Sequence, residues 1–171
     1  MNISDEEKQK LEQTYQSFLN DPKILRMKDI PMHRGSNCYV HVFKVAKRAI
    51  KKALKSKNKN IDLEVVLVGA ILHDYYLYDW RKDKSLLKGH GKRHQYVASK
   101  NAQEDFNISD EVKLVIESHM WPMNIKEFPK SKEAKIVTLS DKAIAIAESF
   151  TSKKHKENKK EYYLDYISHL F

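Results

Sequence analysis

The stretch LEVVLVGAILHD, residues 63–74, is almost continuously apolar until it ends in His73 and Asp74. Apolar periodicity cannot separate a buried strand from a buried helix in so uniform a run. Its length and the helical patterns on both sides of it favour a central buried helix over residues 62–74, capped by Asp62. An imidazole and a carboxylate at the end of such a helix are both metal-binding groups. The pair indicates a metal site only if neighbouring helices supply further side chains of the same types.

The composition is typical of a helical protein. The 171 residues include only four Gly and four Pro, which is few for a chain with many strands and turns. Hydrophobic residues make up 41% of the chain, enough for a sizeable core, and the length suits one domain. We therefore predict an all-α helical bundle that forms a single domain over residues 1–171. Helices at 4–20 and 160–170 would pack on the rest of this domain.

The net charge of +9 would suit an anionic partner such as nucleic acid, anionic lipid or a small phosphorylated ligand. The lysine clusters at 51–60 and 153–160 lack the interleaved aromatic residues of single-strand binders. We interpret them as solvated surface, which disfavours nucleic acid as the partner. The sequence leaves a homodimer open.

The cellular compartment follows from what the sequence lacks. It has no apolar run of about 18 residues, so we expect no membrane span. The N-terminal residues contain no apolar signal-peptide core. The single Cys38 excludes an internal disulfide and suggests a reducing compartment. We expect a cytoplasmic protein that does not bind membranes.

Capping residues and apolar periodicity predict the other helices. Ser4 opens a capping box at the start of the first helix, and Asn37, Ser109 and Ser131 are suitable caps for later ones. Pro122 prevents the helix after Ser109 from running much further. The remaining expected helices cover residues 38–56, 92–106 and 131 to about 150, whereas segments 21–37 and 82–91 are expected to be irregular.

Six His and Asp side chains fall near the core-facing stripes of five of these helices: His41, His73, Asp74, His94, His119 and Asp141. Any one of them has an ordinary explanation, such as a hydrogen-bonded core histidine. Together they predict a metal centre, because helical bundles build such centres from facing helices and because a buried charge needs a partner. Four nitrogen or oxygen ligands suit one divalent transition-metal ion, and six that share a carboxylate suit two. The candidate metals are Fe, Mn, Zn and Ni.

The order of these residues resembles the HD-domain metal-dependent phosphohydrolase superfamily, an all-helical fold. His41 is followed by the pair His73-Asp74 and then by Asp141. The segment HQYVASKNAQEDF (94–106) is similar to the His-x-x-x-small segment of members with a dinuclear centre, and IESHMWP (116–122) to the Ile-x-x-His helix that follows it. SDKAIAIAE (140–148) resembles the helix that bears the final Asp. The resemblance covers about residues 33–150, which would form the core of the domain. The segments HDYYLYDW and HMWP resemble a group of bacterial HD proteins of general or unassigned hydrolase function.

This resemblance implies a ligand set. His41, His73, Asp74 and Asp141 would hold the first metal, and Asp74 would bridge to a second metal that His94 and His119 also bind. Two departures bear on the substrate. The segment YYLYDW lacks the Glu-Asp pair of guanosine-tetraphosphate hydrolases, and Leu77 stands where cyclic-dinucleotide phosphodiesterases have a Lys. Both substrates are therefore disfavoured. The branch that cleaves dinucleoside tetraphosphates shares the His94 and His119 pattern but not convincingly the loops.

The function implied by the resemblance is hydrolysis of a phosphoester or phosphoanhydride in a small phosphorylated substrate, with a nucleotide as the favoured class. Metal ions would activate water and, with nearby cations, neutralise the phosphoryl charge. The candidate cations are Arg93, Lys142, Lys92 and Arg34, each of which could also be an ordinary surface charge. Two alternatives remain within the HD type: a non-catalytic regulatory module that binds metal and nucleotide, and a dinuclear-iron oxygenase. A third alternative, outside the HD type, is that the basic surface binds nucleic acid.

Further residues are candidates for the wall of the pocket. His33 could donate a proton, Arg34 and Trp80 could contact substrate, and His90 could line the entrance or replace His94 as a ligand. We prefer His94 as the ligand because its spacing to Ala98 and Ala102 matches the family segment. The tyrosines at 75, 76 and 78 would stack on a base or pack the edge of the core.

Overall fold

A computed structural model of the protein describes residues 3–32, 36–58, 60–82, 89–150 and 159–171, the side chains of 159–162 excepted. In these ranges all the regular secondary structure is helical, apart from one isolated antiparallel bridge that joins Pro31 to Asn37. The all-α prediction is confirmed. The helices are α1 (Asp5–Asn20), α2 (Pro22–Leu25), the 3-10 turn η1 (Arg26–Asp29), α3 (Cys38–Leu54), α4 (Leu63–Leu72), α6 (His90–Phe106), α7 (Asp110–Ser118), α8 (Lys132–Phe150) and α9 (Lys159–Tyr166).

The predicted caps start the helices. Ser4 Oγ accepts from the backbone N–H of Glu7, and the Glu7 carboxylate accepts from the N–H of Ser4, which is a complete capping box. Asn37, Asp62 and Ser109 each accept a backbone N–H in the first turn of α3, α4 and α7. These bonds satisfy N–H groups that have no partner inside the helix.

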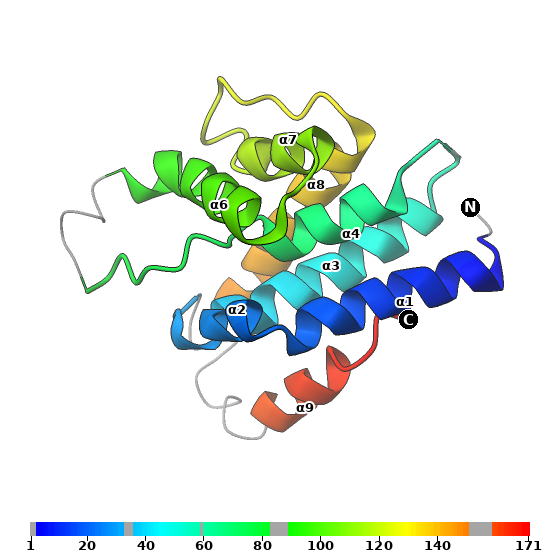
Figure 1. The fold of residues 1–171 in the computed structure, drawn as a ribbon. Coiled ribbons are helices and arrows are strands. Elements are labelled where there is room, and N and C mark those ends of the chain that lie inside the picture. The colour runs from blue at the N-terminus through cyan, green and yellow to red at the C-terminus, as the bar shows by residue number, and fades with distance from the viewer. Residues whose placement is uncertain (1–2, 33–35, 59, 83–88, 151–158) are drawn as a thin grey trace.

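The core forms around α3 and α4, which lie side by side through the middle of the molecule (Figure 1). α3 also packs on α8, while α4 packs on α7, α8 and α1. α4 is apolar on all sides because helices surround it, which explains its uniform sequence. At Gly69 a Cβ atom would lie 2.6 Å from Cγ1 of Val115, so the missing side chain lets α4 and α7 approach closely.

Several predicted boundaries were wrong. Segment 21–37 is not wholly irregular, since Asp21 caps the short α2 and η1 follows it. The buried helix ends at Leu72, with His73 as its cap, so His73 and Asp74 follow the helix rather than form its last turn. α6 begins at His90, inside the expected loop, because Gly89 adopts the left-handed conformation (φ 93°) that starts the turn.

The C-terminal helix is also shorter than expected and ends at Tyr166. The residues after it lie against α1: Tyr15 donates its hydroxyl to the carbonyl of Ile167 at 2.7 Å, and the N–H of Leu170 donates to Glu12. Within the described ranges, no helix combines the length and the apolar character needed to cross a bilayer.

Candidate metal centre

The six predicted ligands meet at one place in the core, where several helices end. His73 caps α4 and Asp74 follows it, while His119 caps α7. His41 lies in the first turn of α3, His94 in the second turn of α6 and Asp141 in the middle of α8. Each side chain is buried, with at most 7% of the residue exposed. Helix C-termini carry partial negative charge, so the ends of α4 and α7 favour a cation here.

Backbone hydrogen bonds fix the tautomer of three of the histidines. A carbonyl oxygen can only accept, so an Nδ1 atom bonded to one carries the hydrogen and leaves the Nε2 lone pair free to bind a metal. The Nδ1–carbonyl distances are 2.8 Å from His73 to Ala70, 2.9 Å from His94 to His90 and 2.6 Å from His119 to Ile116. The chain thus presents three imidazoles in the form that metal coordination requires.

The inward-facing atoms lack sufficient hydrogen donors. Nε2 of His94 lies 3.0 Å from Nε2 of His119 and 3.2 Å from Oδ1 of Asp74. Within the described part of the chain, His73 Nε2 and Asp74 Oδ1 are buried without a hydrogen-bond partner. In neutral rings with the hydrogen on Nδ1, these Nε2 lone pairs and the Asp74 carboxylate repel one another unless a proton or a metal cation lies between them. The residues therefore fit a metal ion.

Ligand atoms lie within 4.8 Å of one another in three groups: His41, His73 and Asp74; His73, His119 and Asp141; and Asp74, His94 and His119. The last group coincides with the predicted second site. The predicted first site is divided between the other two groups, which share His73. This arrangement could hold one ion or two, and Asp74 belongs to both predicted sites.

The electrostatics of the cluster are those of a cation site. Burial alone would raise the pKa of Asp74, but the imidazoles of His73, His119 and His94 hold it well below its usual range. For Asp141, His41 and His73 likewise overcome the effect of burial and hold the pKa well below normal. Burial lowers the pKa of His119 to about 4, so its ring is neutral and available as a ligand.

His41 differs from the other three histidines, since a carboxylate lies at each of its nitrogens. Nε2 is 3.1 Å from Oδ1 of Asp141 and Nδ1 is 2.9 Å from Oε2 of Glu148. Burial would lower the pKa of His41, but these two carboxylates raise it to about 10. Without a metal ion, a proton on His41 offsets part of the negative charge.

A pocket of about 310 Å³ opens onto the cluster. Asp74, His94, His119 and Asp141 form part of its wall, and its rim includes Met32, Tyr76, Trp80, Arg81, Met120 and Lys142. Arg81 donates to the carbonyls of Pro31 and Met32 at 2.7 and 3.0 Å, which ties the rim to the segment before α3. Sequence analysis did not identify Arg81.

His94 and His90 occupy different places beside the cluster. His94 contributes a ligand atom to the cluster, whereas His90 is stacked between Trp80 and His94, with ring centroids 5.1 and 4.7 Å away. The hydroxyl of Tyr78 lies 2.9 Å from Nδ1 of His90. Burial and the neighbouring His94 lower the pKa of His90 to about 4. His90 is therefore a neutral wall of the pocket, as is Trp80, whose ring also contacts the guanidinium of Arg81.

The candidate cations are placed differently. Lys142 lines the pocket, where Nζ donates to the carbonyl of His119 at 2.9 Å and to Oδ2 of Asp141 at 3.1 Å. The side chain of Arg93 lies beside Gly89 at the start of α6. His33 and Arg34 lie outside the described residues, so the structure does not test the roles predicted for them.

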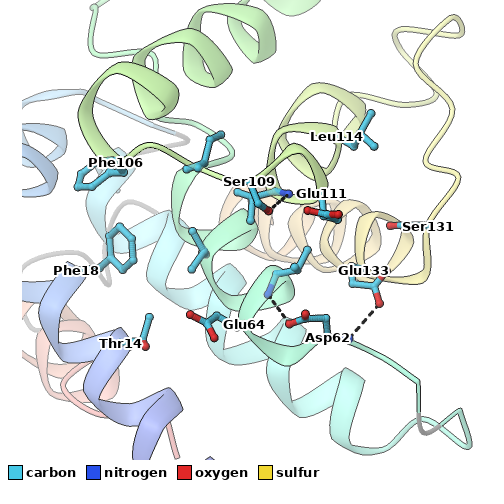
Figure 2. A pocket seen from close by; sticks show the side chains of 14 residues that line it. Thr14, Phe18, Asp62, Glu64, Phe106, Ser109, Glu111, Leu114, Ser131 and Glu133 are labelled. Carbon is cyan, nitrogen blue, oxygen red and sulfur yellow. Dashed lines mark hydrogen bonds between the residues drawn. The ribbon is translucent and has the colours of Figure 1, made fainter.

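A second cavity, of about 760 Å³, lies at the opposite ends of α4 and α7 (Figure 2). Its apolar lining includes Val65 and Val112, and it is bordered by the acidic residues Asp62, Glu64, Glu111 and Glu133. The first turns of α4, α7 and α8 supply these carboxylates, and acidic residues are favourable at helix N-termini. The acidic border of this larger cavity thus consists of ordinary helix starts.

Comparison with known proteins agrees with the geometry. The family model described as HD domain matches residues 38–146, which is more than half of the chain and runs from α3 into α8. All six clustered residues lie within the match. Searches of curated proteins and of solved structures found no match. The family consists largely of metal-dependent phosphohydrolases and includes non-catalytic members. The chain belongs to the HD domain family.

Proposed function

We propose that the protein is a metal-dependent phosphohydrolase that cleaves a phosphoester or phosphoanhydride bond in a small phosphorylated substrate, with nucleotides as the first class to test. The observation that supports this most is the convergence of six buried ligands in which Asp74 Oδ1 and His73 Nε2 lack hydrogen-bond partners. In the proposed centre, His41, His73, Asp74 and Asp141 would hold one ion, and Asp74, His94 and His119 would hold a second.

A bound divalent ion would lower the pKa of a coordinated water molecule and place positive charge at the phosphoryl group. The chain's own residues do the rest. Asp74 belongs to both proposed ligand sets and would contribute its carboxylate to each. Lys142, fixed by the carbonyl of His119, lines the pocket beside Asp141 and would stabilise charge that develops on phosphoryl oxygens. The apolar rim, with Met32 and Met120, limits the access of bulk water.

The pocket supports a small substrate. Its volume of about 310 Å³ is at the lower end of the range of about 300–1,000 Å³ for small-molecule sites. Tyr76 and Trp80 form an aromatic side against which a base or another planar group could pack. We propose that this wall binds the organic part of the substrate while the ligand cluster faces the phosphate.

The test combines metal analysis with a turnover screen. Protein purified without chelator should contain one to two transition-metal ions per chain, and it should release phosphate or nucleotide products from at least one member of a panel of nucleotides and phosphomonoesters. Turnover should disappear on treatment with chelator and return when metal is added. Bound metal with tight nucleotide binding but no turnover would indicate a regulatory module, and oxygen consumption without phosphate release would indicate an iron oxygenase.

Substitution of the candidate cations is a second test, because it should lower catalysis without changing metal binding. Lys142→Met should lower kcat/KM by about 10²-fold, because one donor at a developing negative charge contributes this much, while the metal content stays unchanged. Arg93→Met is the companion variant. Unchanged kinetics in either variant would remove that residue from the proposed mechanism.

A further inference from the structure

Glu148 is a buried carboxylate at the edge of the proposed metal centre. It lies on α8, two helical turns after Asp141, and retains 7% exposure. Its Oε2 atom is 2.9 Å from Nδ1 of His41, while Oδ1 of Asp141 is 3.1 Å from Nε2 of the same ring. The ring of His41 is thus held between two carboxylates of one helix, and only the Asp141 side faces the ligand cluster.

This contact determines which nitrogen of His41 can bind a metal. A carboxylate accepts hydrogen bonds, so Glu148 keeps a hydrogen on Nδ1, while the hydrogen that Nε2 shares with Asp141 is the one that a metal ion in the cluster would displace. The other three histidines obtain the same tautomer from backbone carbonyls. A carboxylate also carries full charge, which makes the imidazole a stronger electron donor toward a metal.

Glu148 is itself held in place from the far side. Its Oε1 atom lies 3.1 Å from Nζ of Lys44, which is also buried, and Ser36 Oγ donates to the same oxygen at 3.4 Å. Nζ of Lys44 lies over the ring of Tyr163 on α9, 3.4 Å from its centroid. Pairing with Lys44 offsets the free energy of burying the carboxylate. A continuous series of contacts therefore runs from α9 through Lys44 and Glu148 to His41.

We propose that Glu148 is a positioning residue of the metal centre, which fixes the tautomer and orientation of His41, and that Lys44 holds Glu148 in place for this purpose. The proposal rests on the metal centre proposed above. Glu148 and Tyr163 both lie beyond residue 146, where the family match ends. Two of the three residues in this series of contacts therefore lie outside the matched region, whereas Lys44 lies inside it.

The test is a titration of metal-stripped protein with Co²⁺, because the visible absorption of Co²⁺ reports its coordination independently of turnover. Removing an outer partner of a metal-bound histidine typically weakens metal binding by about 10–100-fold. We expect such a loss in Glu148→Ala, with a changed absorption spectrum at saturation. Glu148→Gln should lose less, because its amide carbonyl can still accept from Nδ1 although the charge is gone.

Two further variants control for folding. Glu133→Gln lies on the same helix, and its carboxylate accepts from the backbone N–H of Asp62 far from the ligands, so Co²⁺ affinity and spectrum should stay at wild-type values. Glu148→Ala leaves Lys44 buried without its carboxylate, which could unfold the protein. The double variant Glu148→Ala with Lys44→Met removes that buried charge and should show the same loss of Co²⁺ affinity.

The outcomes separate this inference from the metal centre on which it rests. Wild-type Co²⁺ affinity and spectrum in folded Glu148→Ala, or in the double variant, would overturn the positioning role while leaving the metal centre intact. A wild-type protein that binds no Co²⁺ would overturn both. The expected order of affinity, with wild type above Glu148→Gln and Glu148→Ala lowest, would support both.

Discussion

The two ends of helices α4 and α7 carry opposite chemistry. At the N-terminal ends, Asp62 and Ser109 cap the helices beside a cavity of about 760 Å³. At the C-terminal ends, Asp74 and His119 line the pocket of about 310 Å³. By volume alone, the N-terminal cavity would be the stronger candidate for a functional site.

Hydrogen bonding reverses that ranking. At the N-terminal end, Asp62 accepts from the backbone of Val65, Glu64 pairs with Lys10 at 2.8 Å, and Glu133 accepts from the N–H of Asp62. At the C-terminal end, two buried ligand atoms have no hydrogen-bond partner in the described ranges, and two imidazole nitrogens face each other at 3.0 Å. A functional site in this fold is marked by polar groups that the protein itself does not satisfy.

The largest expected effect distinguishes the two aspartates that flank α4. Asp74→Ala should empty the metal site and reduce hydrolysis to background, since Asp74 belongs to two of the three ligand groups. Asp62→Ala should keep its metal and lose only about 1 kcal/mol of unfolding free energy, as expected for an N-cap. Metal content by elemental analysis checks both. Full metal content in Asp74→Ala would remove the distinction between the two ends.

The next effect concerns the number of metal ions. His119→Ala should lower the stoichiometry by about one ion per chain if the centre is dinuclear, because His119, His94 and Asp74 form one of the ligand groups. His169→Ala is the matched control, since its side chain is 74% exposed and lies near Glu12, remote from the cluster. An unchanged ratio of metal to protein in His119→Ala would refute the second site.

A smaller effect is expected where α4 and α7 approach each other. Gly69→Ala places a Cβ 2.6 Å from Val115, so it should destabilise the metal-free protein by about 1–3 kcal/mol, the usual cost of overpacking. Gly91→Ala places its Cβ 3.7 Å from Met123, an ordinary contact in a helix, so it should be neutral or stabilise by up to about 1 kcal/mol. Denaturant unfolding measures both. Equal stabilities would show that the close approach at Gly69 is not required.

The smallest effect tests whether α7 acts as a rigid connection between its ends. Ser109→Ala removes the cap of α7 and should lower the unfolding free energy by about 1 kcal/mol. The metal affinity should not change, because the bond from His119 to Ile116 lies at the other end of the helix. A lower metal affinity in Ser109→Ala would show that the two ends of α7 are coupled.

The sequence predicted most of the fold because its signals are local. Capping by Ser4, Asn37 and Ser109, and apolar periodicity along α3 and α7, depend on neighbours within one or two turns. The errors arose where local signals are weak. The four-residue α2 is too short for periodicity, and the start of α6 depends on the backbone conformation of Gly89.

The ligand set was also predictable in part. The resemblance identified six residues that the fold brings together, and the atoms that lie within 4.8 Å of one another include one from His94 and none from His90. Glu148 was missed, although its spacing of seven residues from Asp141 places both on one face of α8. That spacing is common in helices and gains meaning only because His41, from α3, lies between the two carboxylates.

The sequence by itself determined the helices, their apolar faces and the residue types able to bind a metal, because propensity, capping and periodicity act over a few residues. Only the tertiary structure decided which nitrogens face inward, which buried atoms lack partners, and that α9 supports His41 through Lys44 and Glu148. These properties depend on distances between side chains far apart in the sequence, which packing sets and no local pattern records.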